Sequence, residues 1–463
     1  MTTRLPVLAP STIAAIATPP GRGGIGIVRV SGANLDRVIE GIVGRPLHSR
    51  VATAVTFRDA NGAPIDVGLA LVFPAPNSYT GETVVEFHGH GSPPALRLVL
   101  ARCLELGARL AEPGEFTKRA FLNGKLDLAQ AESVADLIDA ATTTAARAAA
   151  KSLVGEFSRD VHAIVAAVTD LRMYTEATLD FPEEDLDFLR AHDVTGRLDA
   201  IREKLDQLLS LAAVGTLLRE GLSVVLIGRP NVGKSSLLNR LVREEAAIVT
   251  PIAGTTRDTV ERQVELAGIP LTVIDTAGLR ETRDEVEKRG IERAWAAVER
   301  ADLALLIVDA RDAIDALDSA DAALLGKLPG SLPRVVVHNK SDLASVAAHA
   351  ETRLVGNAPR RHIWLSALTG AGVELLEREV LAIVGAQTAT EDTFLARARH
   401  LVALKDAVSR LRAAAAHFAT SPPPIELFAE ELREAQQALG TITGEFTADD
   451  LLGVIFSRFC IGK

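Results

Sequence analysis

The sequence predicts a multidomain protein that combines α+β and α/β folds. At 463 residues the chain is about three times as long as a typical domain. Short apolar runs separated by Gly and Pro fill its first quarter, and two stretches with helical periodicity flank a region where β-branched runs alternate with helices. We therefore expect an amino-terminal domain (residues 1–122), a helical domain in two segments (123–219 and 385–463), and an α/β domain inserted between them (220–384).

The composition indicates a folded chain outside the membrane. Hydrophobic residues make up 48% and charged residues 24%, which argues against global disorder. No run approaches about 18 apolar residues, and the amino end lacks a basic region followed by an apolar one, so we expect no membrane span, no signal peptide and a cytoplasmic location. The two cysteines, Cys103 and Cys460, cannot form a disulfide framework or a four-thiolate metal site.

The charge balance excludes a general nucleic-acid binder. Fifty basic and sixty acidic residues give a net charge of −10, and aromatic residues make up only 4%, so neither a basic surface nor a base-stacking platform is indicated for the whole chain. A local basic patch remains compatible with these numbers. Contact with RNA has to be inferred from other features.

The first region has the pattern of an α+β domain. Its β-rich runs are Ile25 to Val30, Val67 to Phe73 and Thr83 to Phe87. Asn61-Gly62 precedes the second run and predicts a hairpin turn, because both residue types accept positive φ.

The second and fourth regions have helical spacing. Leu198, Ile201, Leu205 and Leu208 recur at the interval that places them on one helix face. The run from Phe181 to Asp185 predicts a turn or a helix start, with its acidic residues on a solvated face. After Thr393 helices are expected to Lys463, with a break at Ser421-Pro422-Pro423-Pro424.

The third region predicts a mostly parallel sheet covered by helices on both faces. Its apolar runs are Val224 to Ile227, Leu271 to Ile274, Leu303 to Val308 and Arg334 to Val337. The first run leads into Gly228-Arg229-Pro230-Asn231-Val232-Gly233-Lys234-Ser235, a phosphate-loop pattern between a strand and a helix. In such loops glycines bring backbone N–H groups close to phosphate, Lys234 would reach the β- and γ-phosphates, and the Ser235 hydroxyl would bind magnesium.

Four further elements follow in the order of a Ras-like GTPase. Asp275-Thr276-Ala277-Gly278 comes after a strand, where the carboxylate can hold magnesium through water and the glycine can sense the γ-phosphate. Asn339-Lys340-Ser341-Asp342 supplies an aspartate that can accept two hydrogen bonds from guanine, which selects GTP. Ser366-Ala367-Leu368 supplies a backbone contact to guanine, and Gly254-Thr255-Thr256-Arg257-Asp258 a threonine that closes on magnesium.

The residues expected to contact GTP are Asn231, Val232, Gly233, Lys234, Ser235, Ser236, Thr250, Pro251, Ile252, Ala253, Gly254, Thr255, Thr256, Asp275, Thr276, Ala277, Gly278, Asn339, Lys340, Asp342, Ser366 and Ala367.

Leu279 stands where Ras-like GTPases keep a water-orienting glutamine, and a leucine cannot orient water. Asn231 could instead bind a monovalent cation that places positive charge between the phosphates, or it could be an asparagine tolerated in a tight loop. Glu287 could orient water, or it could belong to a solvated helix face.

Three further segments resemble the bacterial MnmE (TrmE) family of tRNA-modification GTPases, and the resemblance spans essentially the whole chain. They are Thr18 to Gly24, Pro113 to Asn123, and the carboxyl end from Ile442 to Phe446 and from Cys460 to Lys463. A lipidated terminal cysteine is excluded, since Gly462 is not aliphatic and Lys463 is not an accepted final residue.

The resemblance implies the chemistry of each domain. It implies reduced-folate binding (5-formyl- or 5,10-methylene-tetrahydrofolate) and dimerisation for the first domain, and potassium-stabilised pairing of two G domains. The implied folate residues are Arg29, Glu86, Lys125 and Lys463. The implied potassium ligands are Asn231, Thr250, Ile252 and Thr255, and the magnesium ligands are Ser235 and Thr256. The implied catalytic residues are Lys234, Glu287 and Cys460.

The resemblance also implies a function. A homodimer of the chain would form a heterotetramer with the FAD-dependent partner MnmG and add an aminomethyl or carboxymethylaminomethyl group to C5 of uridine 34 in tRNA. Two alternatives stay open on the residues alone. One is a GTPase switch in ribosome assembly, and the other is an assembly module in which nucleotide only controls dimerisation.

Overall fold

The computed structural model describes residues 11–180, 193–244, 261–266, 268–275, 298–312, 319–326, 328–355, 358–383, 393–445, 449–457 and 459–462. The chain forms two compact units, Met1–Ala135 with Gln437–Lys463, and Asp136–Gln436. Both boundaries lie inside helices, α4 (Leu128–Asp139) and α14 (Ile425–Thr443). The predicted four-part division therefore stays a prediction. Within the described residues, no helix is both long and apolar enough to span a bilayer.

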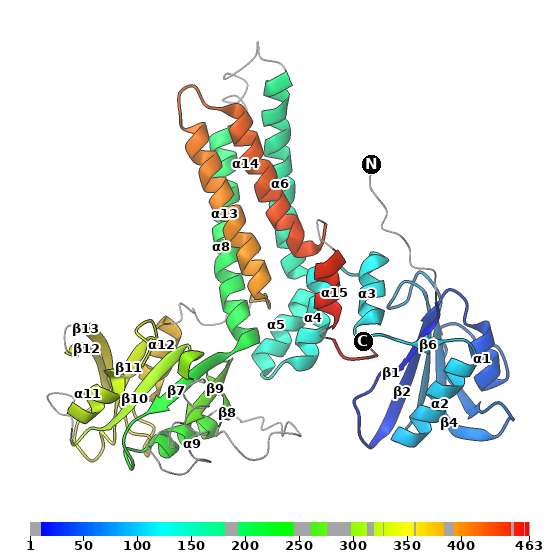
Figure 1. Ribbon diagram of the computed structural model, residues 1–463, viewed down its shortest axis with the longest axis horizontal. Helices are drawn as coiled ribbons and strands as arrows, with labels where there is room; N and C mark the ends of the chain where they lie inside the picture. The colour runs from blue at the N-terminus through cyan, green and yellow to red at the C-terminus, as the bar shows by residue number, and fades with distance from the viewer. Residues whose placement is uncertain are drawn as a thin grey trace. The chain divides into compact units, whose positions relative to one another are not determined.

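The first unit is built on a six-stranded sheet in the order β3-β4-β5-β2-β1-β6 (Figure 1). Its strands are β1 (Ile13–Ile16), β2 (Gly23–Gly32), β3 (Thr53–Arg58), β4 (Pro64–Phe73), β5 (Thr83–Gly91) and β6 (Arg109–Leu110). All neighbours are antiparallel except β1 and β6. Gly62 has φ 80° in the turn between β3 and β4, which confirms the predicted hairpin.

The two faces of this sheet differ because side chains alternate along each strand. Val28 and Val30 on β2 and Phe87 on β5 pack with helices α1 (Asp36–Val43) and α2 (Pro93–Glu105). Arg29 and Glu86, at the intervening positions, point to the opposite face. The predicted α+β class of this region is confirmed.

The carboxyl end of the chain belongs to the same unit. Leu128 of α4 packs with Phe456 of α15 (Asp449–Ser457) and with Phe459. Gly114 precedes α3 (Glu115–Leu122) with φ 65°, and a Cβ there would lie 2.7 Å from the Phe456 carbonyl oxygen. Because Gly114 has no side chain, the start of α3 and the segment after Phe456 can pack closely against each other.

Long helices form one part of the second unit. They are α5 (Thr143–Val154), α6 (Glu156–Asp180), α8 (Val194–Glu220), α13 (Ala398–Phe418) and most of α14. Figure 1 shows α6, α8, α13 and α14 lying side by side. The periodic leucines predicted for α8, including Leu198 and Leu205, are buried. The break at 421–424 separates α13 from α14 as predicted, whereas 181–185 lies outside the described residues.

The other part of the second unit is a seven-stranded sheet in the order β12-β13-β11-β10-β7-β9-β8. Its strands are β7 (Leu222–Ile227), β8 (Glu261–Leu266), β9 (Ile269–Asp275), β10 (Leu303–Asp309), β11 (Arg334–Asn339), β12 (His349–Val355) and β13 (Ala358–Trp364). The five central strands are parallel, and each edge strand is antiparallel to its neighbour.

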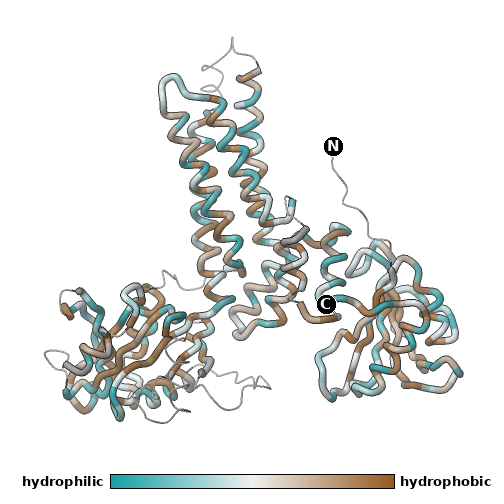
Figure 2. Tube along the Cα trace, in the orientation of Figure 1, coloured by the Kyte–Doolittle hydropathy of each residue, from teal (hydrophilic) through white to brown (hydrophobic). Residues whose placement is uncertain are grey.

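Helices cover both faces of this sheet, as predicted. Helices α9 (Lys234–Glu244) and α12 (Val373–Ile383) pack on one face through Leu237 and Leu376. Helix α11 (Ser319–Gly326) packs on the other through Leu325. Figure 2 shows the hydrophobic colour concentrated along the central strands. The sequence did not anticipate the antiparallel edge strands β8 and β12, which have more polar sequences.

Candidate functional site

The carboxyl ends of four parallel strands bring the predicted nucleotide elements together. β7 ends at Ile227 before the phosphate loop, β11 ends at Asn339, and β13 ends at Trp364 before Ser366. β10 lies between β7 and β11 and ends at Asp309. Such an edge is where open α/β sheets bind their ligands.

Glycine is required at two positions of the phosphate loop. Gly228 has φ 147° and Gly233 has φ 98°. A Cβ on Gly228 would lie 2.3 Å from the Ile307 carbonyl oxygen, and one on Gly233 would lie 2.1 Å from Nδ2 of Asn339. The loop is therefore packed too closely against β10 and β11 to carry side chains there.

Lys234 and Ser235 begin helix α9. The ammonium of Lys234 donates to the carbonyl oxygens of Gly228 and Arg229 at 2.7 and 2.8 Å, which holds it over the loop. Ser235, Ser236 and the loop residue Asn231 are exposed. The free N–H groups of a helix amino end attract phosphate, so the lysine and the helix favour the same ligand.

Asn339 ties three of the predicted elements to one another. Its buried side chain donates to the Val232 carbonyl oxygen at 2.9 Å and accepts from the Ala367 N–H at 3.0 Å. Ser366 is buried, whereas the Asp342 side chain is exposed at the edge of the site. Helix α9 also supports the loop that carries Ser366 and Ala367, because Arg240 donates to the Ala367 carbonyl oxygen at 3.1 Å.

Asp309 is a residue that the sequence reasoning missed. Its carboxylate pairs with Lys340 at 2.8 Å and with Arg311 at 2.8 Å. The hydrogen bonds from Arg311, together with the one from Lys340, hold the pKa of this carboxyl well below its usual range although burial opposes the shift. The signal available in the sequence was an aspartate that ends the apolar run 303–308.

Two buried histidines lie on β11 and β13, the strands that lead into the two loops predicted to contact guanine. Nε2 of His338 and Nδ1 of His362 are 2.9 Å apart, and the ring of His338 stacks on Trp364 with centroids 4.1 Å apart. Burial lowers the pKa of His338 to about 3 and that of His362 to about 4, and the nearby Arg353 lowers both. Both rings are therefore neutral at physiological pH.

Several predicted residues lie outside the described ones. They are Thr250, Pro251, Ile252, Ala253, Gly254, Thr255, Thr256, Thr276, Ala277, Gly278, Glu287 and Lys463. Asp275 ends β9, beside β7, so its backbone is placed at the same sheet edge.

The first unit holds the predicted folate residues. Nε of Arg29 donates to Oε1 of Glu86 at 2.8 Å, and the guanidinium lies 5.3 Å from the Tyr79 ring centroid. Nε2 of His88 lies 3.0 Å from the second Glu86 oxygen. Lys125 is exposed and adjoins this region, because a Cβ on Gly81 would lie 3.4 Å from its Cγ. Arg29 and Glu86 thus share one site, and Lys125 adjoins the loop that carries Tyr79.

The two cysteines have opposite environments. Cys103 is buried on α2, and burial raises the pKa of its thiol to about 12. Cys460 is exposed in the terminal segment, where its carbonyl oxygen accepts from the Gly114 N–H at 3.3 Å. A Cβ on Gly462 would lie 2.4 Å from the Ile16 carbonyl oxygen, so Gly462 packs directly against the end of β1.

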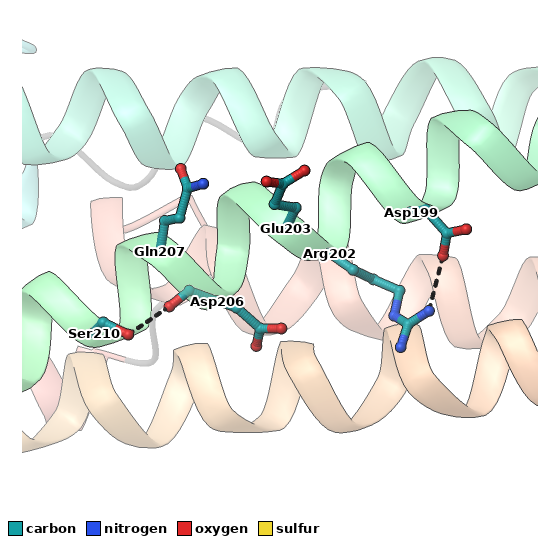
Figure 3. A pocket seen from close by; sticks show the side chains of 6 residues that line it. All are labelled: Asp199, Arg202, Glu203, Asp206, Gln207 and Ser210. Atoms are coloured by element: carbon teal, nitrogen blue, oxygen red, sulfur yellow. Dashed lines mark hydrogen bonds and ion pairs between the residues drawn. The ribbon is translucent and has the colours of Figure 1, made fainter.

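A shallow depression on α8 carries none of the predicted residues (Figure 3). It is lined by Asp199, Arg202, Glu203, Asp206, Gln207 and Ser210. Arg202 donates to Asp199 at 2.9 Å, and the Ser210 hydroxyl donates to the Asp206 carbonyl oxygen at 2.9 Å. Its excess of carboxylates makes it unsuited to phosphate.

Two family models cover most of the chain. The model described as MnmE helical domain matches residues 128–460, and the one described as GTP-binding protein TrmE N-terminus matches residues 12–125. The chain belongs to the MnmE family. It is accordingly a GTP hydrolase of a family named for tRNA modification.

Curated MnmE proteins are similar along nearly their full length. The chain is 58% identical over 454 residues to the tRNA modification GTPase MnmE of Laribacter hongkongensis, 57% over 454 residues to that of Nitrosomonas eutropha, and 56% over 452 residues to that of Dechloromonas aromatica. Each match covers 98% of this chain and 99% of the relative.

Proposed function

We propose that this member of the MnmE family is a potassium-activated GTPase that acts in tRNA wobble-uridine modification. With the FAD-dependent partner MnmG it would add an aminomethyl or carboxymethylaminomethyl group to C5 of uridine 34 in certain tRNAs. The carbon would come from 5-formyl- or 5,10-methylene-tetrahydrofolate. The single observation that carries the GTPase part is the Asn339 side chain, which joins the phosphate loop at Val232 to the guanine loop at Ala367.

The described residues fit a magnesium nucleotide. Ser235 offers an exposed hydroxyl in the first turn of α9, and hard oxygen ligands are those that magnesium prefers. Lys234 lies over the loop where phosphate oxygens can replace its two carbonyl acceptors. Ser235 and Thr256 would hold magnesium, which neutralises charge on the phosphates, and Asp342 would select guanine.

Potassium would be held by the exposed Asn231 together with Thr250, Ile252 and Thr255. Asn231 has φ 63° at the tip of the phosphate loop, a conformation that asparagine adopts more readily than most residues, and its exposed side chain is available to a bound cation. Bound potassium would supply positive charge beside the phosphates, and Glu287 would orient the attacking water.

The first unit would bind the folate. Glu86 suits the amide and amino donors of a pterin, and Arg29 suits the glutamate tail, with Lys125 and Lys463 as further cations. Cys460 and Arg29 lie in the same compact unit, which supports a role for the exposed thiol in the same chemistry. We propose that the protein acts in the cytoplasm as a homodimer and assembles with MnmG into a heterotetramer.

MnmG would also provide most of the tRNA surface. A net charge of −10 makes the chain alone a weak ligand for tRNA, because phosphate contacts dominate such affinity.

Nucleoside analysis by mass spectrometry tests the modification. tRNA from cells that lack the chain should lose 5-carboxymethylaminomethyl-type uridines, and neither Cys460→Ser nor Glu287→Ala should restore them. Cys103→Ala and Glu285→Ala are the matched controls and should restore them. An unchanged nucleoside profile in the deleted cells would favour the alternative of a GTPase switch in ribosome assembly.

Rates of GTP hydrolysis in potassium and in sodium at equal ionic strength test the cation. The rate should be higher in potassium, and the difference should disappear in Asn231→Ala. Equal rates for the unmodified chain would contradict potassium activation and leave the magnesium-dependent GTPase in place.

A further inference from the structure

Asp309 lies at the sheet edge that holds the predicted nucleotide elements, and its side chain is almost completely buried. It is 6% exposed and pairs in register with Asn339 on the neighbouring strand β11. Its Oδ1 accepts from the backbone N–H and Nε of Arg311 at 3.1 and 3.0 Å. Its Oδ2 accepts from Nη2 of Arg311 and from Nζ of Lys340, both at 2.8 Å.

Lys340 connects Asp309 to the phosphate loop. The same ammonium that pairs with Asp309 donates to the Asn231 carbonyl oxygen at 2.6 Å. Lys340 also has φ 64°, a backbone conformation that residues other than glycine rarely adopt. Its side chain bridges the two loops, and Asp309 is the carboxylate that pairs with its ammonium there.

We propose that Asp309 is a positioning residue for nucleotide binding. It holds the Lys340 ammonium on the Asn231 carbonyl, so that the segment Asn339-Lys340-Ser341-Asp342 and the phosphate loop are already aligned when the nucleotide binds. Removing the carboxylate takes away the charged partner of Lys340, so its side chain is held less firmly and more of its rotamers must be ordered when nucleotide binds. The roles of Lys340 and Asn231 rest on the proposed function, whereas the contacts of Asp309 do not.

A double-mutant cycle on the full-length chain tests this inference. The affinity for a fluorescent GDP analogue is measured for Asp309→Asn, Lys340→Met and the double variant. We expect Asp309→Asn to weaken binding about tenfold, the effect of losing a charged hydrogen bond. In the Lys340→Met background the same change should alter affinity less than about twofold, because Asp309 acts through Lys340. If Asp309 only stabilised the fold, its substitution would weaken nucleotide binding by the same factor in both backgrounds.

Steady-state hydrolysis and two further variants complete the test. The KM for GTP of Asp309→Asn should rise while its kcat at saturating GTP stays within about threefold, since Asp309 affects alignment before binding. Asp302→Asn is the matched control, because Asp302 lies at the other end of β10 and accepts from the Ser223 N–H at 2.8 Å. Asp309→Ser repeats the cycle should the asparagine variant fold poorly.

The outcomes separate this inference from the proposed function. Unchanged affinity in Asp309→Asn, or an equal loss in both backgrounds, overturns the positioning role alone. Unchanged affinity in Lys340→Met contradicts the proposed nucleotide site itself, and with it the route by which Asp309 would act.

Discussion

Arg29 and Glu86 face each other across strands β2 and β5, and their side chains form an ion pair of 2.8 Å. Neither is fully buried, with 23% and 15% of the side chains exposed. A ligand that carries both amide-type donors and a carboxylate can exchange with this pair and leave neither charge without a partner. A reduced folate has both groups, which is why we expect the two residues to act together.

Folate affinity should therefore depend on both members of the pair. We expect Arg29→Met and Glu86→Gln each to weaken binding of 5-formyl-tetrahydrofolate at least about tenfold, as for a lost charged hydrogen bond. Isothermal titration calorimetry measures the effect. Arg37→Met, on the exposed side of α1, is the control and should bind as the unmodified chain does. Full affinity in both site variants would place the folate elsewhere.

A methyl group on Gly233 should disrupt guanine recognition. The new Cβ would lie 2.1 Å from Nδ2 of Asn339, and φ 98° is unfavourable for alanine. We expect Gly233→Ala to weaken GDP binding more than about tenfold by displacing the Asn339 amide. Gly326→Ala is the matched control, because a Cβ on Gly326 meets nothing within 4 Å. Equal affinity of the two variants would show that the loop can shift at no cost.

The close approach of the terminal segment to Gly114 gives a third prediction. A Cβ on Gly114 would lie 2.7 Å from the Phe456 carbonyl oxygen and 2.9 Å from Cβ of Phe459. We expect Gly114→Ala to lower the modified-uridine content of tRNA while GTP hydrolysis stays intact, because it displaces the segment that carries Cys460. Gly24→Ala, where a Cβ meets nothing within 4 Å, should preserve the modification. A normal content of modified uridine with Gly114→Ala would show that modification does not depend on the position of the segment that carries Cys460.

The buried histidine pair should make the second unit sensitive to acid. The folded state holds the pKa of His338 at about 3 and that of His362 at about 4, against 6.5 for a free imidazole. The unfolded chain therefore binds more protons between pH 4 and 6.5, so stability is full above pH 6.5 and falls below it, by up to about 1.4 kcal/mol per pH unit for each ring.

Thermal unfolding followed by tryptophan fluorescence measures this effect, since Trp364 stacks on His338 in the second unit. The melting temperature should drop between pH 7 and pH 5, and the drop should be smaller in the double variant His338→Leu/His362→Leu. An identical pH dependence in that variant would assign the acid sensitivity to other groups.

The sequence predicted the parallel core and the nucleotide elements because both depend on local patterns. An apolar strand, the glycines of the loop and Lys234 at the start of a helix follow one another in the chain, so a phosphate loop can be predicted from adjacent residues. Asp309 could not be assigned in the same way, since its importance arises from the order of β10 and β11 in the sheet. The pairing of Arg29 with Glu86 depends likewise on strand register, and 57 residues separate them in the chain.

The opposite environments of the two cysteines give the chain a built-in chemical handle. A maleimide reacts with the thiolate, so the exposed Cys460 should be modified quickly while Cys103, whose thiol has a pKa of about 12, stays protected. A fluorophore can thus be attached at one known position of the unaltered protein. Its emission would report on the surroundings of the terminal segment while the labelled protein binds and hydrolyses GTP.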